Sequence, residues 1–425
     1  MWRAPKARPN PRFGRISGTT LSPLTHRLFT LLWVATLIGN FGNAFQAVGG
    51  SWHMTLIDDR PDMIALAQTA FSAPILVLAM IGGALADLHE PRRIMALAML
   101  TATILSSMLV LLVTLGLLNA WALIALLFAS GGCLAFYNPA MQVAIGHIVP
   151  REDIAGAVSL NILGFNVSRT LGPAIGGIIV AFGGVTAAFA CTVATSLCAM
   201  VMLWSWHPLA NRPPRDRRNH VWHAIGEGLN SIRSSTPLCT LLIRALAFTF
   251  CGSATWALMP LISRDLLQGG PQRFGMLLGA LGLGAVIGAA LSHRVRARYA
   301  NETLVRAAGI IYGTSCLIVA IAPGFPVTTL ALIVAGAGWV QALSGFGVMA
   351  QRWSPRPVIG RVSAATSSVI WGGMAAGSWG WGHVATAVGV AHCIALSGAA
   401  MILLAGLGLL LPLPAHEDAT PMAGR

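Results

Sequence analysis

The sequence predicts an all-α polytopic membrane protein with twelve transmembrane helices in two six-helix, pseudo-symmetric bundles. Composition, recurring apolar runs and a weak internal repeat support this fold class. Of the 425 residues, 56% are hydrophobic and only 9% are charged, whereas soluble proteins average about 25% charged residues. The 47 glycines also suit membrane helices that approach one another closely.

Apolar runs long enough to cross about 30 Å of hydrocarbon, roughly 20 residues each, recur twelve times along the chain. Short polar or glycine-rich turns separate them, and one such turn is the Gly183-Gly184 pair. The expected spans are 28–57, 63–86, 94–118, 121–145, 154–182, 185–206, 238–262, 274–293, 304–323, 327–350, 358–384 and 386–411.

One long polar break separates the first six spans from the last six. We expect it to carry a short amphipathic helix at about 221–232 on the membrane surface. The basic N-terminal segment lacks a small-residue cleavage site, so it is interpreted as a tail rather than a signal peptide. The expected organisation is a cytoplasmic tail at 1–27, a first bundle at 28–206, a cytoplasmic loop at 207–237, a second bundle at 238–411 and a cytoplasmic tail at 412–425.

Short motifs repeat between the two halves at a nearly constant offset. Gly82-x-Ala84-Leu85 is echoed by Gly288-x-Ala290-Leu291, 206 residues later, and Pro150-Arg151 by Pro355-Arg356, 205 residues later. Each match is weak alone. The shared offset favours a parallel six-plus-six repeat, an architecture that occurs among secondary transporters.

The basic residues predict the orientation. If the N-terminus is cytoplasmic, 22 of the 27 lysines and arginines lie in cytoplasmic segments, three in external loops and two within helices. The positive-inside rule then places both termini in the cytoplasm, in the inner membrane of the cell. With its basic residues explained in this way, the net charge of +14 does not indicate a nucleic-acid partner.

The most informative motif is the charged hairpin Gly82 to Met95, which lies between two apolar runs. It resembles the loop between helices 2 and 3 of the major facilitator superfamily, roughly Gly-x-Leu-x-Asp-x-x-x-x-Arg-Arg. The resemblance covers residues 28–410 and implies that the loop helps to set which side of a transporter is open. Asp87 would accept hydrogen bonds from the amino end of the helix near Gly360–Val362, where the helix dipole favours an anion. The candidate gating residues of this contact are Gly82, Asp87, Arg92, Arg93 and Arg361; alternatively the arginines only enforce topology.

A second motif, Gly172-Pro173-x-x-Gly176-Gly177, permits a kink and close helix packing. It resembles the fifth-helix motif of exporters in the same superfamily, and with Asn138-Pro139-Ala140-x-Gln142 it resembles the efflux branch that contains enterobactin exporters. We therefore expect Gly172, Pro173, Gly176 and Gly177 to pack helices in a way that seals one conformation.

Arg169 lies halfway along its span, and an ionisable residue at that depth suggests a functional site. All 13 acidic residues can be placed in loops, tails or helix ends, so Arg169 must use carbonyls, Asn166, water or a bound anion. A polar stripe on the first span adds Asn43 and Gln46. The candidate substrate-binding residues are Asn43, Gln46, Asn138, Gln142, Asn166, Arg169, Trp256 and Gln341; for each one alone, interhelical hydrogen bonding is the simpler explanation.

Because no intramembrane carboxylate is evident, an anionic or neutral-polar small molecule is the expected substrate, exported by alternating access. A siderophore-like metabolite is the preferred class. A multidrug antiporter, a lipid flippase and a non-transporting scaffold remain alternatives. No phosphate-binding loop is present, so an ion gradient is the expected energy source. A coupling proton would use Asp58, Asp59, Asp87, His53 or His383.

The remaining composition argues against other classes of protein. The seven cysteines fall inside apolar runs without Cys-x-x-Cys spacing, so we expect no disulfide framework and no metal site. No triad or metal-ligand spacing supports an enzyme, and no cofactor is expected. The lipid bilayer and a small-molecule substrate are the expected partners of a monomer.

Overall fold

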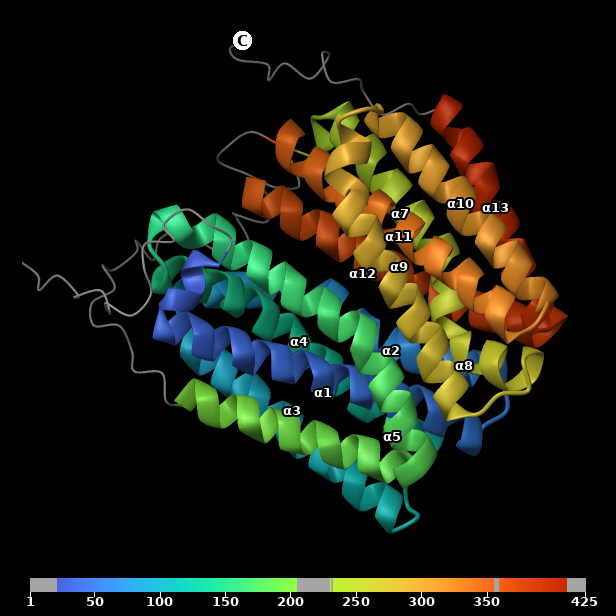
Figure 1. Ribbon diagram of the computed structural model, residues 1–425, viewed down its shortest axis with the longest axis horizontal. Helices are drawn as coiled ribbons and strands as arrows, with labels where there is room; N and C mark the ends of the chain where they lie inside the picture. The colour runs from blue at the N-terminus through green and yellow to red at the C-terminus, as the bar shows by residue number, and fades with distance from the viewer. Residues whose placement is uncertain (1–20, 205–229, 231, 355–358, 411–425) are drawn as a thin grey trace, which may run out of the picture.

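The computed structural model describes residues 21–204, 230, 232–354 and 359–410, and its regular structure there is entirely helical. Figure 1 shows long helices packed side by side in two groups. The N half contains α1 (Arg27–Ile57), α2 (Pro61–Leu88), α3 (Pro91–Thr114), α4 (Ala120–Ile148) and α5 (Ile154–Trp204). The C half contains α7 (Thr236–Ala257), α8 (Met259–Leu261), α9 (Pro271–Arg296), α10 (Asn301–Ile321), α11 (Phe325–Trp353), α12 (Ile359–Val388) and α13 (Val390–Leu410).

These helices supply the twelve expected spans. Nine helices of the described chain are long and apolar enough to cross a membrane. One of them is α5, which contains two spans because its backbone bends at Gly184, where φ is 71°. Glycine tolerates this left-handed conformation without a steric penalty. With α12 and α13 as the last two spans, the predicted fold class is confirmed. The expected amphipathic helix at 221–232 lies almost wholly outside the described residues.

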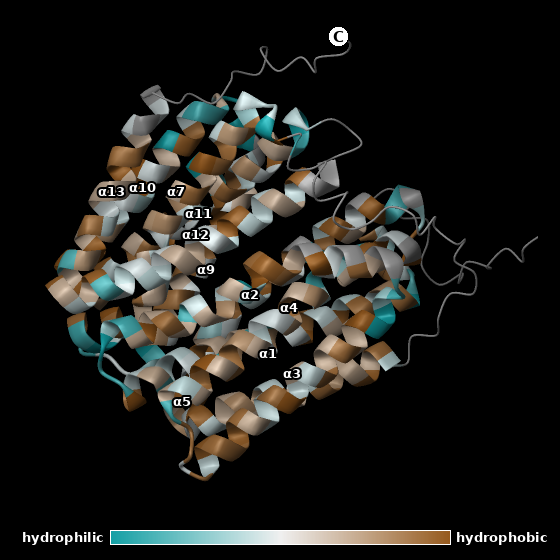
Figure 2. Cartoon of the chain, turned by 180° about the vertical axis from the view of Figure 1, so that it is seen from behind, coloured by the Kyte–Doolittle hydropathy of each residue, from teal (hydrophilic) through white to brown (hydrophobic). Residues whose placement is uncertain are grey.

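The helix ends divide into two sets at opposite ends of the molecule. We call the end that holds Arg27, the α2–α3 turn and the α9–α10 turn the arginine-rich end. The opposite end, with the α1–α2 and α10–α11 turns, is the arginine-poor end. Figure 2 shows hydrophilic residues gathered at helix ends and in turns, while hydrophobic residues dominate the helix bodies.

The buried core shows how the halves meet. One large cluster of buried side chains contains residues of both halves, and its N-half members, such as Val48, Ile64 and Val180, lie toward the arginine-poor end. A second cluster, which includes Phe29, Met95 and Tyr137, contains N-half residues only and lies toward the arginine-rich end. The two halves therefore share a core at the arginine-poor end and have separate cores at the other end. Figure 1 shows the bundles diverging in that direction.

The outward faces of the bundles are suited to lipid. On α3, Leu97, Ile104 and Leu111 recur every seven residues and are 65%, 58% and 55% exposed. Such a stripe of large apolar side chains would be unfavourable in water, whereas a bilayer covers it. The side chains of this stripe thus mark a face of the N half that contacts lipid.

A polar cluster ties the chain before α1 to the turn before α5. Asp153 accepts hydrogen bonds from the Ser22 hydroxyl and from His26 Nε2, the latter at 2.9 Å. These two contacts lower the pKa of Asp153 below its ordinary value of 3.8. A carboxylate with a lowered native pKa contributes stability above the unfolded pKa, and this stability is lost as pH falls through the native value.

We expect segment 21–26 to detach from the N half only below about pH 4. Hydrogen exchange of this segment between pH 3 and pH 7 measures the transition. In the Asp153→Asn variant, exchange of the segment should be fast across this range. Slow exchange in that variant would contradict the assigned tie.

Candidate transport site

One contact between the halves is a glycine seam between α5 and α9. A Cβ atom on Gly275 would lie 2.5 Å from the Pro173 carbonyl oxygen and 2.7 Å from the Gly177 Cα. One turn further along, a Cβ atom on Gly279 would lie 3.1 Å from the Thr170 carbonyl oxygen. The two backbones can approach this closely only because side chains are missing on both faces.

The Gly172-Pro173-x-x-Gly176-Gly177 motif therefore serves two interfaces. Gly172 packs against Ala44 of α1, and Gly176 packs against the Phe45 backbone on the same helix. Pro173 and Gly177 instead face α9 in the C half. The motif holds α5 within its own bundle and also forms the contact between bundles. Its gating role stays a prediction, and this geometry shows how such a role could operate.

A second seam joins α2 to α12. The Thr69 hydroxyl donates to the Ala375 carbonyl at 3.2 Å, and the Asp62 backbone N–H donates to Thr386 Oγ1 at the same distance. Gly382 allows α12 to approach Ala65 of α2. The α5–α9 and α2–α12 seams together close the arginine-poor end.

An ionic contact at the arginine-poor rim was missed from the sequence. Arg264 lies in the π-helical turn η3 (Ile262–Leu266) and donates to the Thr55 carbonyl and to Asp59 of the N half, both at 2.9 Å. Its other donors bind Asp265. The Asp59 side chain is 92% exposed, so the pair itself contributes at most about 1 kcal/mol. The signal in the sequence was that Arg264 is one of only three arginines, with Arg60 and Arg273, at this end of the molecule.

The central cation, Arg169, lies where the α5–α9 seam ends. Its carbonyl oxygen lies 2.7 Å from the position of a Cβ atom on Gly282. Its guanidinium carbon lies 4.6 Å from the centroid of the Trp256 ring on α7, so the contact crosses between the halves. Within the described chain, no carboxylate pairs with Arg169. The hydrogen bonds to carbonyls or to Asn166 that the sequence suggested are not formed among these residues, and Trp256 is the contact of the guanidinium.

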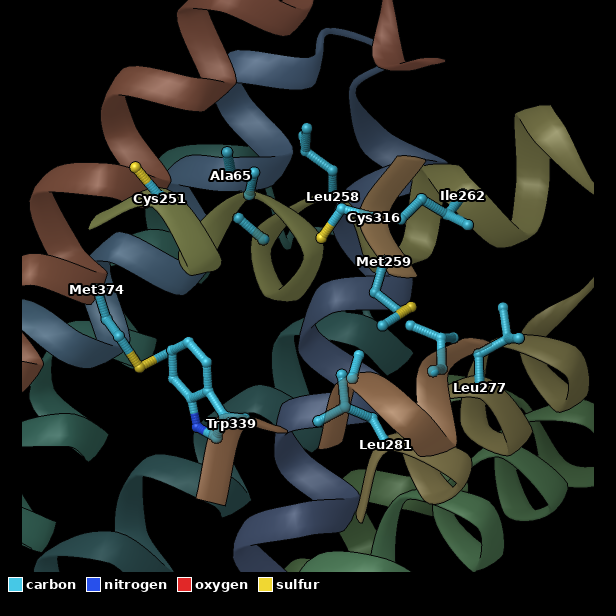
Figure 3. Close-up of a cluster of buried hydrophobic side chains, with 14 of the residues drawn as sticks. Ala65, Cys251, Leu258, Met259, Ile262, Leu277, Leu281, Cys316, Trp339 and Met374 are labelled. Atoms are coloured by element: carbon cyan, nitrogen blue, oxygen red, sulfur yellow. The ribbon is translucent and has the colours of Figure 1, made fainter. Parts of the chain in front are cut away.

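Trp256 connects Arg169 to an aromatic cluster inside the C half. Its ring centroid lies 6.1 Å from that of Trp339, which is completely buried and also contacts Phe248 and Tyr312. The Tyr312 hydroxyl donates to the Gly252 carbonyl at 2.7 Å. Figure 3 shows Trp339 among buried side chains that include Met374, Met259 and Cys316. This packing against Trp339 fixes the position of the Trp256 ring that contacts Arg169.

Two of the other predicted substrate-binding residues, Gln46 and Gln341, form hydrogen bonds with groups other than Arg169. The Gln46 amide donates to Ser130 Oγ at 2.8 Å and accepts from Ser106 Oγ at 3.3 Å, so it links three helices of the N half. Gln341 donates to the Gly288 carbonyl at 2.9 Å, and its own amide oxygen is buried without a partner. Asn138 and Gln142 are exposed on α4, and Asn43 and Asn166 are half-buried.

The charged hairpin is only partly described. Gly82 lets α2 approach α4, because a Cβ atom there would lie 2.6 Å from the Ala135 carbonyl oxygen. Arg92 Nη2 donates to the Trp204 carbonyl at 3.0 Å and so binds the end of α5, and Arg93 pairs with Glu90. The side chains of Asp87 and Arg361 lie outside the described part of the structure, and the latch between Asp87 and the amino end of the helix near Gly360–Val362 stays a prediction.

The second arginine within a span, Arg244, is enclosed in the C half. Its side chain is only 5% exposed and forms an ion pair with Glu302 of α10. Its charge is therefore balanced inside the C half. No group of three or more His, Cys, Asp or Glu side chains that could hold a metal occurs among the described residues.

Comparison with known proteins identifies the family. The sequence profile of the transmembrane secretion effector family matches residues 18–424. The chain belongs to this family of the major facilitator superfamily. It is 25% identical over 353 residues to the enterobactin exporter EntS of Shigella flexneri, with 80% of each chain covered. The same identity and coverage relate it to the enterobactin exporter EntS of Escherichia coli O81 (strain ED1a).

Solved structures support the fold. A bacterial homolog of the human lysosomal transporter Spinster, in an inward-facing and occupied conformation, matches with a TM-score of 0.72 at 14% identity, over 94% of this chain and 99% of that one. The nucleoside transporter NupG matches with a TM-score of 0.68 at 12% identity, over 91% of this chain and 99% of that one. The protein is thus a multi-pass membrane transporter of an efflux family, not an enzyme.

Proposed function

We propose that this transporter exports a small organic anion by alternating access, and that Arg169 binds the anion. The observation that carries this proposal is the guanidinium of Arg169 at the centre of the molecule without a carboxylate partner in the described chain. A charge at such depth is energetically costly, and a residue that carries one is therefore a candidate functional residue. The stack on Trp256 offsets part of the cost, and an anionic substrate would offset the rest.

The seams support alternating access. The backbone contact of Gly177 with Gly275 and the separate Arg264–Asp59 contact join the halves at the arginine-poor end. Among the described residues, the N-half core near the arginine-rich end has no C-half members. We infer that the arginine-rich end is the cytoplasmic side, as the positive-inside rule favours for the inner membrane. In this arrangement substrate would enter from the cytoplasm, and both termini would lie on that side.

The preferred substrate class is a siderophore-like metabolite. This part of the proposal rests on the relatives, whose names specify enterobactin, and on the aromatic surroundings of Arg169. An ion gradient, with a proton as the preferred coupling ion, would drive export. Asp58 is a poor proton carrier, because a hydrogen bond from Arg60 lowers its pKa and keeps it ionised. Asp59, Asp87, His53 and His383 remain the candidate carriers.

Export by Arg169 variants tests the proposal. In everted vesicles, we expect energised wild-type protein to accumulate labelled enterobactin, or an aromatic carboxylate from a parallel panel, and an uncoupler to abolish this accumulation. Arg169→Gln should reduce the initial rate about 100-fold, because loss of one partner of a buried charge pair costs several kcal/mol. Arg169→Lys should retain part of it.

Membrane insertion is checked in each variant by its amount in the vesicles. Transport of the anion by Arg169→Gln at the wild-type rate would refute the assignment of Arg169 as the anion-binding residue. Uptake of cationic drugs instead of anions would favour a multidrug antiporter, and transport of labelled phospholipid would favour a flippase.

A further inference from the structure

We propose that Trp256 is a reversible partner of Arg169. The Trp256 ring binds the guanidinium while the protein carries no substrate, and the transported anion displaces the ring when it binds Arg169. The inference rests on the proposed function, since it concerns the same central cation. It changes the role of Trp256 from the substrate ligand expected from the sequence to a positioning residue that competes with substrate.

The first support is the location of the contact. Arg169 belongs to α5 and Trp256 to α7, so the 4.6 Å cation–π contact joins the two halves. The seam runs along α5 from Gly177 to Thr170 and along α9 from Gly275 to Gly282. Arg169 lies at the inner end of these contacts. Its stack on Trp256 is therefore part of the arrangement in which the arginine-poor end is closed.

The second support is that Trp256 cannot follow Arg169 when the halves move apart. Trp256 packs on Trp339, which is completely buried. Trp339 is itself held against Gly252, where a Cβ atom would lie 2.4 Å from the indole ring. Protein interiors are close-packed and do not deform continuously. Separation of α5 from the C half at this level must therefore break the Arg169–Trp256 contact.

The broken contact must be replaced. A guanidinium that leaves Trp256 has no carboxylate within the described chain to receive it, and an uncompensated charge at this depth is unfavourable. A bound anion supplies the missing partner. The empty protein is thus biased toward a closed arginine-poor end, whereas the loaded protein is released from that bias. This arrangement would suppress movement of the empty carrier.

The proposal predicts the sign of a change in affinity. A ligand competes with Trp256 for Arg169, so loss of Trp256 should raise the apparent affinity for an anion. We expect Trp256→Leu to bind benzoate roughly tenfold more tightly, as for loss of a shielded cation–π partner. If Trp256 is instead a direct substrate ligand, the same variant should bind benzoate more weakly.

Distance measurements between spin labels test both effects without requiring the natural substrate. Labels on p-acetylphenylalanine at Leu117 and Ile321, both exposed near the arginine-poor end, leave all seven native cysteines in place. The probe is benzoate, and benzamide is its neutral control. In wild type we expect short distances that lengthen with benzoate and not with benzamide. Trp256→Leu should show the longer distances without ligand, and Trp256→Phe should behave nearly as wild type.

Each remaining outcome contradicts the proposal. If Trp256→Leu gave the same distances as wild type, the Arg169–Trp256 contact would not stabilise the closed arginine-poor end. Weaker benzoate binding by Trp256→Leu would make Trp256 a ligand. No response of wild type to benzoate would refute release by an anion. If Arg169→Gln abolishes export while Trp256→Leu leaves the distances unchanged, only this inference fails; normal export by Arg169→Gln would remove the proposed function as well.

Discussion

Gly275→Ala should shift the protein away from the arrangement in which the arginine-poor ends meet. The added methyl group would lie 2.5 Å from the Pro173 carbonyl oxygen and 2.7 Å from the Gly177 Cα. Both are backbone atoms of a packed helix, which cannot turn aside as a side chain would. Overpacking of this kind costs about 1–3 kcal/mol, which corresponds to a roughly 5- to 150-fold change in the population of the closed state.

The spin-label pair at Leu117 and Ile321 measures this shift directly, and export in everted vesicles measures its consequence. Gly177→Ala should behave in the same way, because its Cβ atom would meet the Gly275 Cα and the Pro271 carbonyl oxygen, both at 2.8 Å. Gly347→Ala is the matched control, since nothing lies within 4 Å of its Cβ position. Equal distances in Gly275→Ala and Gly347→Ala would contradict the assigned seam.

Arg244→Gln should destabilise the folded protein by about 3–5 kcal/mol, because it removes one partner of a buried ion pair. The Arg244 and Glu302 side chains are 5% and 19% exposed, so solvent can replace little of the lost interaction. The loss should appear as a lower melting temperature of the purified protein in detergent. Glu302→Gln should have an effect of similar size.

Two further variants make this prediction specific. Arg60→Gln breaks an ion pair with Asp58 in which the arginine side chain is 60% exposed, and it should leave the melting temperature nearly unchanged. The double variant Arg244→Met, Glu302→Leu should recover part of the lost stability, since apolar residues of similar volume often replace buried ion pairs well. If Arg244→Gln and Arg60→Gln melt alike, the buried pair contributes little to stability.

Much of the fold followed from local patterns. Apolar runs and breaks located the spans, and the turn expected at Gly183-Gly184 is the bend within α5. These features were predictable because each depends on the preference of one segment for lipid or water, or on the conformational freedom of a glycine.

Contacts between residues of different helices were not predictable in the same way. The sequence left open whether Gln46 binds substrate or links helices, and its amide binds Ser106 and Ser130. Gly275, Gly279 and Gly282 form half of the seam, although only their three- and four-residue spacing distinguished them from the other glycines. Arg264 contacts Asp59 across 205 residues of sequence. Such contacts depend on how two bundles dock.

By itself, the sequence determined a twelve-span membrane protein, the unequal distribution of arginine between its ends, and a single deep cation without an acidic neighbour. These properties follow from the cost of placing charge and backbone polar groups in hydrocarbon. Only the tertiary structure decided which end is closed, that Gly177 meets Gly275 there, and that Arg169 stacks on Trp256 of the other half. Contacts between bundles depend on the shape of both packed surfaces, which no single helix specifies.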